Sequence, residues 1–95
     1  MTKFTINGYR LELTCGACPE QYDVFLGEEL VAYLRLRHGW FYAACPYVGG
    51  TVVYEAYPKG DGMFEDDERE FYLTEAIKAI CSHQFKVYAN RETYF

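Results

Sequence analysis

Two sequence periods meet at Gly60–Glu70, where the chain reads GDGMFEDDERE. Upstream of it, apolar and polar residues alternate in short runs separated by glycine-containing turns, a pattern typical of half-buried strands. Downstream, Leu73, Ala76, Ile77 and Ile80 recur at helical spacing and form one apolar stripe. The segment Gly60–Glu70 therefore ends a β-rich region and leads into a helix.

Five strands are predicted in the region before this junction. They cover Tyr9–Leu13, Tyr22–Leu26, Leu30–Arg37, Trp40–Cys45 and Thr51–Tyr57. The connections between them are short, so neighbouring strands must run antiparallel, because parallel neighbours need a crossover of about a dozen residues or more. A short final strand is predicted at Phe85–Ala89. The predicted sheet therefore has five or six strands.

One helix is predicted, from about Glu68 to His83. Asp67 is the expected N-cap, and Glu70, three positions further on, would complete a capping box. Acidic residues in the first turn also favour the positive end of the helix dipole. We expect a single α+β domain over residues 1–95, in which the C-terminal helix packs on one face of an antiparallel sheet.

Length and charge limit the functions that fit this chain. Its 95 residues carry a formal net charge of −5, which disfavours binding to nucleic acid phosphates. No catalytic triad, cofactor loop or complete metal-ligand set is recognisable, so we predict a non-enzymatic protein without a cofactor. The N-terminal residues lack the apolar stretch of a secretory signal, and no membrane span fits the sequence, so a cytoplasmic setting is expected.

Four cysteines leave a second interpretation open. Cys15 and Cys18 have the spacing of half a zinc site, but a closed site needs four ligands. The remaining candidates, Cys45, Cys81 and His83, together with His38, lie far apart in the chain and do not form a usual second pair. A small zinc-stabilised or homo-oligomeric module is therefore an alternative. Otherwise, Cys45 and Cys81 are predicted to be buried and Cys15 and Cys18 to lie in a surface turn.

The charge of the chain is uneven, and this points to a binding surface. Residues 30–50 carry a balance of +2 from Arg35 and Arg37, whereas residues 59–70 carry a balance of −4. Alternation along Leu30–Arg37 predicts that Tyr33, Arg35 and Arg37 point away from a helix that covers the face of Leu30, Leu34 and Leu36. Tyrosine and arginine are enriched in interface hot spots, so we predict partner binding there.

The chain also resembles small bacteriophage, prophage and other mobile-element proteins. The resemblance covers Leu11–Ile80 and is carried by three phrases: CPEQYDV at 18–24, YLRLRHG at 33–39, and GDGMF at 60–64 followed by Glu68-Arg69. It implies a bacterial host cell and carries over no catalytic residue. By analogy of size, charge and origin with anti-CRISPR proteins, it implies a protein that binds and inhibits a host defence protein.

The acidic cluster is the second predicted contact with such a partner. Its members are Glu65, Asp66, Asp67, Glu68 and Glu70. A negatively charged helix start suits docking over a basic nucleic-acid channel of a host protein, because complementary charge steers association. A homodimer through the open sheet face is the other arrangement that this surface allows.

Overall fold

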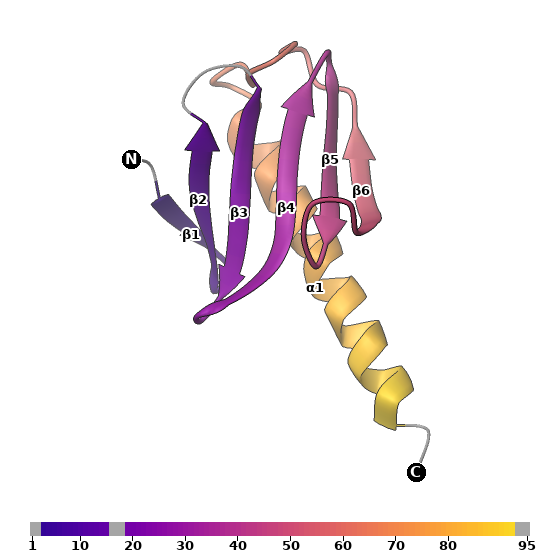
Figure 1. Cartoon of the computed structure of the whole chain (residues 1–95). Coiled ribbons are helices and arrows are strands. Elements are labelled where there is room, and N and C mark those ends of the chain that lie inside the picture. Colours follow the sequence, from indigo (N-terminus) through magenta and orange to yellow (C-terminus); the bar gives the residue numbers. More distant parts are fainter. Residues whose placement is uncertain (1–2, 16–18, 93–95) are drawn as a thin grey trace.

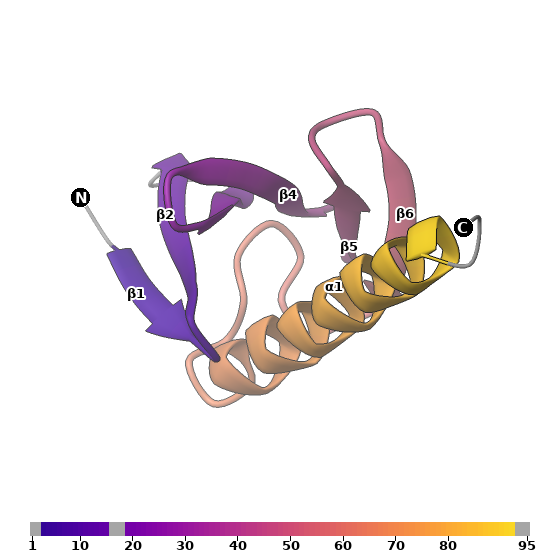
Figure 2. The same cartoon turned by 90° about the horizontal axis from the view of Figure 1, so that it is seen from below.

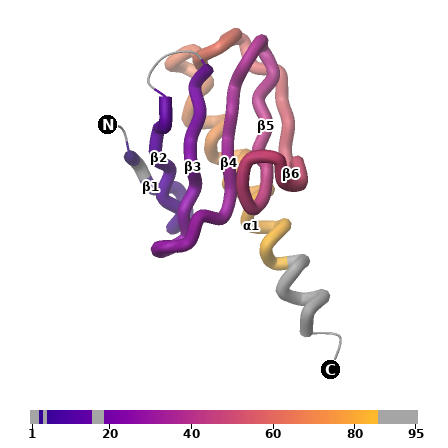
Figure 3. The backbone as a smooth tube through the Cα atoms, in the orientation of Figure 1, coloured from indigo at the N-terminus to yellow at the C-terminus, as the bar shows by residue number. Residues whose placement is uncertain are grey.

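The computed structural model describes residues 3–15 and 19–92 and confirms the predicted α+β fold. Its elements are β1 (Lys3–Ile6), β2 (Tyr9–Cys15), β3 (Glu20–Leu26), β4 (Glu29–Arg37), β5 (Trp40–Cys45), β6 (Thr51–Ala56) and α1 (Arg69–Glu92). The strands form one six-stranded antiparallel sheet in the order β1-β2-β3-β4-β5-β6 (Figure 1). Every strand pairs with its neighbour in sequence, as Figure 3 traces.

Two of these turns have the same backbone geometry. At Asn7-Gly8, φ is 54° and 84°, and at His38-Gly39, φ is 55° and 74°. Two consecutive residues with positive φ make the two-residue hairpin loop whose twist matches that of the flanking strands. The His38-Gly39 turn was predicted, whereas β1 and its Asn7-Gly8 hairpin were missed. The Asn-Gly pair is itself a strong hairpin signal, so the sequence contained the information.

The sheet is curved, and its concave side holds the core. Figure 2 shows α1 and the segment 57–68 inside this curve, with α1 packed mainly against β5 and β6. The core consists of fully buried apolar side chains from both layers, among them Leu11, Val24, Leu34, Leu36, Phe41, Leu73, Ile77 and Ile80. Each such side chain contributes about 1.5–3 kcal/mol to stability. The predicted apolar stripe of the helix is therefore confirmed as its buried face.

The helix is longer than predicted. Residues 85–89, predicted as a strand, lie inside α1, which continues to Glu92. No glycine or proline occurs between residues 69 and 92, so nothing in the local sequence ends the helix at His83. The prediction of a final strand was therefore wrong, and the sixth strand is β1 at the other end of the chain.

The predicted alternation along β4 holds only in part. Val24 pairs with Ala32 but Phe25 pairs with Leu30, so Val31 is an extra residue in a β-bulge. As a result Val31 is buried, with 5% of its surface exposed, whereas Leu30 is 38% exposed. The predicted faces of these two residues were wrong, while alternation from residue 32 to residue 37 follows the prediction.

Candidate functional site

The side of the sheet opposite α1 carries a cluster of arginine and aromatic side chains. We call it the arginine–aromatic face, and its members are Tyr33, Arg35 and Arg37 from β4 and Trp40 and Tyr42 from β5. They point away from the core because they alternate with Leu34, Leu36, Phe41 and Ala43, which are fully buried. The predicted partner-binding residues Tyr33, Arg35 and Arg37 are thus brought together on one face.

The hairpin between β4 and β5 fixes the neighbours of the two arginines. Its register places Tyr42 opposite Arg35 and Trp40 opposite Arg37. The Trp40 and Tyr42 rings lie 4.6 Å apart between centroids, and those of Tyr33 and Tyr42 lie 6.3 Å apart. The Tyr33 hydroxyl donates a hydrogen bond to Gln21 Oε1 at 2.8 Å. The arginines therefore lie beside a connected group of aromatic rings.

Neither Arg35 nor Arg37 is paired within the described part of the chain. No acceptor there receives a hydrogen bond from either guanidinium, and no carboxylate there forms an ion pair with them. Arg35 Nε is buried and has no hydrogen-bond partner. A buried donor without an acceptor costs about 1–3 kcal/mol. The fold accepts this cost within a side chain that also lines a surface hollow.

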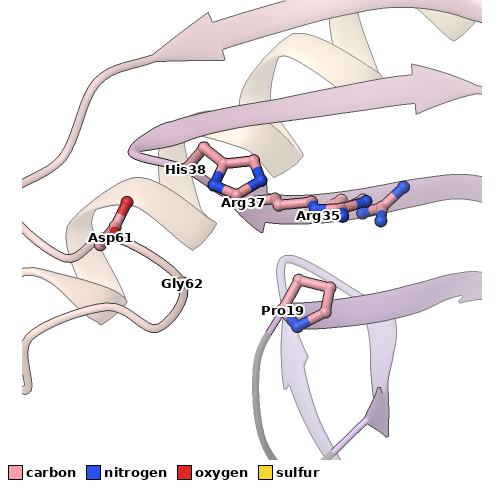
Figure 4. Close-up of a pocket in the computed structure, with 6 residues that line it drawn as sticks. All are labelled: Pro19, Arg35, Arg37, His38, Asp61 and Gly62. Atoms are coloured by element: carbon pink, nitrogen blue, oxygen red, sulfur yellow. The ribbon is translucent and has the colours of Figure 1, made fainter.

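A groove runs beside the two arginines. Figure 4 shows Arg35, Arg37 and His38 along one wall, facing Pro19 and Asp61-Gly62 on the other. Its volume is about 340 Å³. A second hollow of about 320 Å³ shares Arg35, Arg37 and His38 and extends the groove to Trp40 and Tyr42. Together they offer space of the size that small ligands or single side chains of a partner occupy.

Backbone hydrogen bonds hold the far wall of the groove to the sheet. The Glu20 N–H donates to the Gly62 carbonyl at 2.7 Å, and the Gly39 N–H donates to the Asp61 carbonyl at 2.7 Å. The segment 57–68 is thus joined to the start of β3 and to the β4–β5 turn. Gly60 allows its tight path, because a Cβ there would lie 1.8 Å from the Met63 carbonyl oxygen.

The buried carboxylate of Glu68 organises this segment from within. It accepts hydrogen bonds from the N–H groups of Lys59, Gly60 and Glu65 at 2.8–2.9 Å. Burial alone would raise the pKa of this carboxyl, but the three N–H donors outweigh burial and lower it. Glu68 lies directly before α1, and its side chain accepts from the Glu65 N–H three positions back, as the acidic residue of a capping box does. The capping interaction thus lies two residues earlier than the predicted Asp67–Glu70 pair.

A second buried carboxylate, Glu20, joins the sheet to the helix start. With 3% of its surface exposed, it accepts hydrogen bonds from Arg69 Nε at 2.8 Å, from Arg69 Nη2 at 3.1 Å and from the Phe64 N–H at 3.0 Å. The Tyr22 hydroxyl also donates to it. Burial favours the neutral acid, but Arg69, Tyr22 and the Phe64 N–H together hold the pKa of Glu20 below its ordinary value.

The acidic cluster is less uniform than the sequence indicated. Glu68 is buried, and its carboxylate accepts hydrogen bonds from within the chain, so Glu68 is not available to contact a partner. Asp66 Oδ1 lies 2.9 Å from Arg69 Nη1, and Asp67 Oδ2 lies 3.0 Å from Lys59 Nζ.

Glu65 and Glu70 complete the account of the cluster. Both are exposed, and neither forms an ion pair within residues 3–15 and 19–92. The cluster lies at the start of α1, which Figure 1 places behind the sheet, whereas Arg35 and Arg37 point to the opposite side. The two predicted contact regions therefore face different directions.

The cysteines described by the structure are all free thiols. Cys45 is buried in β5, where burial raises the pKa of its thiol to about 11, and Cys81 is exposed on α1, contrary to its predicted burial. Cys15 is partly exposed at the end of β2, and Cys18 lies outside the described residues. In the described ranges, no three histidine, cysteine or acidic side chains are placed to hold a metal ion.

Comparison of the chain with known protein families, with curated proteins and with solved structures found no match. Within the part of the chain that the structure describes, no helix is both long and apolar enough to span a membrane.

Proposed function

We propose that this chain is a non-catalytic binding protein that docks on a partner protein through its arginine–aromatic face. The observation that carries the proposal is that Arg35 and Arg37, unpaired among the described residues, lie beside Trp40 and Tyr42 on a sheet face that the helix leaves uncovered. Arginine, tyrosine and tryptophan are the residues that dominate interface hot spots, because they combine large apolar area with directed hydrogen bonds.

The proposed partner is a host protein in the bacterial cytoplasm, such as a CRISPR-type defence effector, which the chain would inhibit by occupying its surface. The resemblance to mobile-element proteins supports this choice, as does the net charge of −5, which suits a basic nucleic-acid channel. Glu65, Asp66, Asp67 and Glu70 would form a second contact. Because they lie on the other side of the sheet, a partner would have to surround the chain, or two partners would bind it.

Site-specific photo-crosslinking in a bacterial host tests the docking face. A photoreactive phenylalanine analogue replaces Trp40 on the arginine–aromatic face or, as the control, Phe85 on α1. Phe85 is 74% exposed and Trp40 only 38%, so random encounters would favour the control position. We expect one discrete crosslinked protein from position 40 and none from position 85.

Two results would contradict the proposal. Crosslinks from position 85 that equal those from position 40 would show that the arginine–aromatic face has no special role. Crosslinks only to a second copy of the chain would replace the host partner with the homo-oligomeric module that the sequence left open. A photoreactive residue at Glu70 then tests the acidic contact separately.

A further inference from the structure

We propose that the groove beside Arg35 and Arg37 binds one carboxylate side chain, presented by an extended segment of the partner protein that carries no further acidic residue at the groove. This inference rests on the proposed docking function and identifies the chemistry that the groove recognises. The groove consists of two adjacent hollows that share Arg35, Arg37 and His38, one bounded by Asp61-Gly62 and the other by Trp40 and Tyr42.

The two guanidinium groups provide the attraction for an anion. Arg35 and Arg37 are two residues apart on one strand, so they leave the same face roughly 7 Å apart. Their cross-strand neighbours are Gln21, Tyr42 and Trp40, none of which carries a negative charge. A guanidinium matches a carboxylate with two parallel hydrogen bonds, so an incoming carboxylate would accept from the Nη groups of the arginines, whereas the buried Nε of Arg35 lies out of its reach.

The surroundings select a single carboxylate rather than a chain of phosphates. Asp61 lines the opposite wall, and Glu55 lies at the other end, where its Oε1 accepts a hydrogen bond from Trp40 Nε1 at 3.0 Å. A polyanion lying along the groove would meet these carboxylates and the net charge of −5 of the chain. Such like-charge contacts provide specificity by repelling the wrong ligand. A lone glutamate or aspartate side chain beside the arginines would meet fewer of these like charges.

The aromatic end of the groove accounts for the rest of the bound segment. Trp40 and Tyr42 lie 4.6 Å apart between ring centroids and form an apolar surface next to the arginines. A residue adjacent to the bound carboxylate can pack its ring or alkyl chain there. The opposite wall is preformed, because hydrogen bonds from Glu20 and Gly39 fix the Asp61-Gly62 backbone, and a preformed wall lowers the entropy cost of binding.

Amide-shift titration of the isotope-labelled full chain tests the inference with defined probes. The acidic probe is a capped peptide, Gly-Glu-Phe-Ser-Gly, and its matched control has glutamine in place of glutamate. Oligothymidine and inorganic phosphate are the competing anions. We expect saturable shifts at Arg35, Arg37 and the Trp40 indole with the acidic peptide, and binding at least about tenfold weaker for the glutamine peptide and both competing anions.

Two double variants separate the groove from general charge. Arg35→Gln with Arg37→Gln should weaken binding of the acidic peptide by at least about tenfold, whereas Lys59→Gln with Lys78→Gln removes the same charge and should leave it within about twofold. Both lysines are exposed and lie outside the groove. Arg37→Gln alone, at an exposed position, serves as the test if the arginine double variant does not fold.

Each remaining outcome overturns the inference. It fails if the acidic peptide gives no saturable shifts, if the glutamine peptide binds equally well, or if oligothymidine or phosphate binds more tightly. It also fails if the lysine variant loses as much binding as the arginine variant. If the photoreactive residue at position 40 still crosslinks a host protein while these peptide tests fail, the docking proposal stands and only carboxylate recognition is contradicted.

Discussion

Charged side chains have different partners on the two sides of the sheet. On the concave side, the carboxylates of Glu20 and Glu68 are buried, and each accepts at least three hydrogen bonds. On the open side, Arg35 and Arg37 have no acceptor among the described residues. The first pair therefore holds the chain together, and the second does not. Arg10, which alternates with buried Tyr9 and Leu11 on the same open side, is paired with Glu12 at 2.8 Å, so the difference identifies Arg35 and Arg37 in particular as charges available to something outside the molecule.

The stabilising role of the concave-side carboxylates is tested most strongly at Glu20. Replacing Glu20 with glutamine keeps the size of the side chain but leaves the guanidinium of Arg69 without its buried carboxylate. We expect the free energy of unfolding to fall by about 3 kcal/mol, because a buried charge that loses its partner is strongly destabilising. Urea unfolding measures the change.

The control for this variant is Glu28→Gln, at an exposed position in the β3–β4 turn. It should change the free energy of unfolding by less than about 0.5 kcal/mol. A loss below about 1 kcal/mol at Glu20 would contradict the assignment of the concave carboxylates to stability.

Sequence patterns predicted the elements of this fold better than its irregularities. Period-two runs, turn residues and one helical stripe were enough for five strands and the helix start, since each is a local feature. The bulge at Val31 was not predictable, because it depends on how Phe25 of the neighbouring strand pairs with Leu30. The Glu20–Arg69 pair joins residues 49 positions apart, and only the folded chain brings them together.

The candidate site was predictable to a similar extent. Alternation along β4 placed Tyr33, Arg35 and Arg37 on one face. The turn predicted at His38-Gly39 fixes the hairpin register, and this register brings Trp40 and Tyr42 beside the two arginines, a step that the prediction did not take. The Asp61-Gly62 wall of the groove could not be predicted, because the position of Asp61 depends on the path of an irregular segment. The hydrogen bonds that fix this path involve Glu20 and Glu68, which have no local signature in the sequence.

Lowering the pH should destabilise the fold through the concave-side carboxylates. The loss of unfolding free energy should be smaller than that caused by Glu20→Gln. Hydrogen bonding holds the pKa of Glu20 and Glu68 below the value of about 4.3 expected in the unfolded chain. Their contribution is therefore fully present above about pH 5 and is lost as the pH falls below about 4, because the unfolded chain then binds more protons. We expect the unfolding free energy to fall between pH 7 and about pH 3 in wild type, and to fall less in the Glu20→Gln variant.

The measurement to use is the difference between the wild-type and Glu20→Gln curves, because another carboxyl also affects the wild-type curve. Burial and the nearby Glu12 raise the pKa of Asp23 on the open face, so Asp23 contributes with the opposite sign and gains relative stability as the pH falls. It is present in both proteins and cancels in the comparison. Parallel curves for wild type and Glu20→Gln would mean that Glu20 does not drive acid unfolding.

The smallest predicted effect has the opposite sign to the first. Arg35→Met keeps an unbranched side chain that can pack where the arginine stem lies, and it removes the buried Nε that has no partner. We expect the free energy of unfolding to rise by about 1 kcal/mol, since an unsatisfied buried donor is removed without loss of a hydrogen bond within the described residues. Arg37→Met, at an exposed position, should stay within about 0.5 kcal/mol of wild type.

Chemical unfolding of these two variants, with binding of the acidic peptide measured in parallel, decides whether the contrast holds. If Arg35 serves an external ligand, stability should rise while peptide binding falls, since a residue retained for recognition often costs the fold some stability. A loss of stability of more than about 1 kcal/mol in Arg35→Met would instead show that Arg35 supports the sheet as Arg69 supports the core. The two sides of the sheet would then not differ in the way their charges are used.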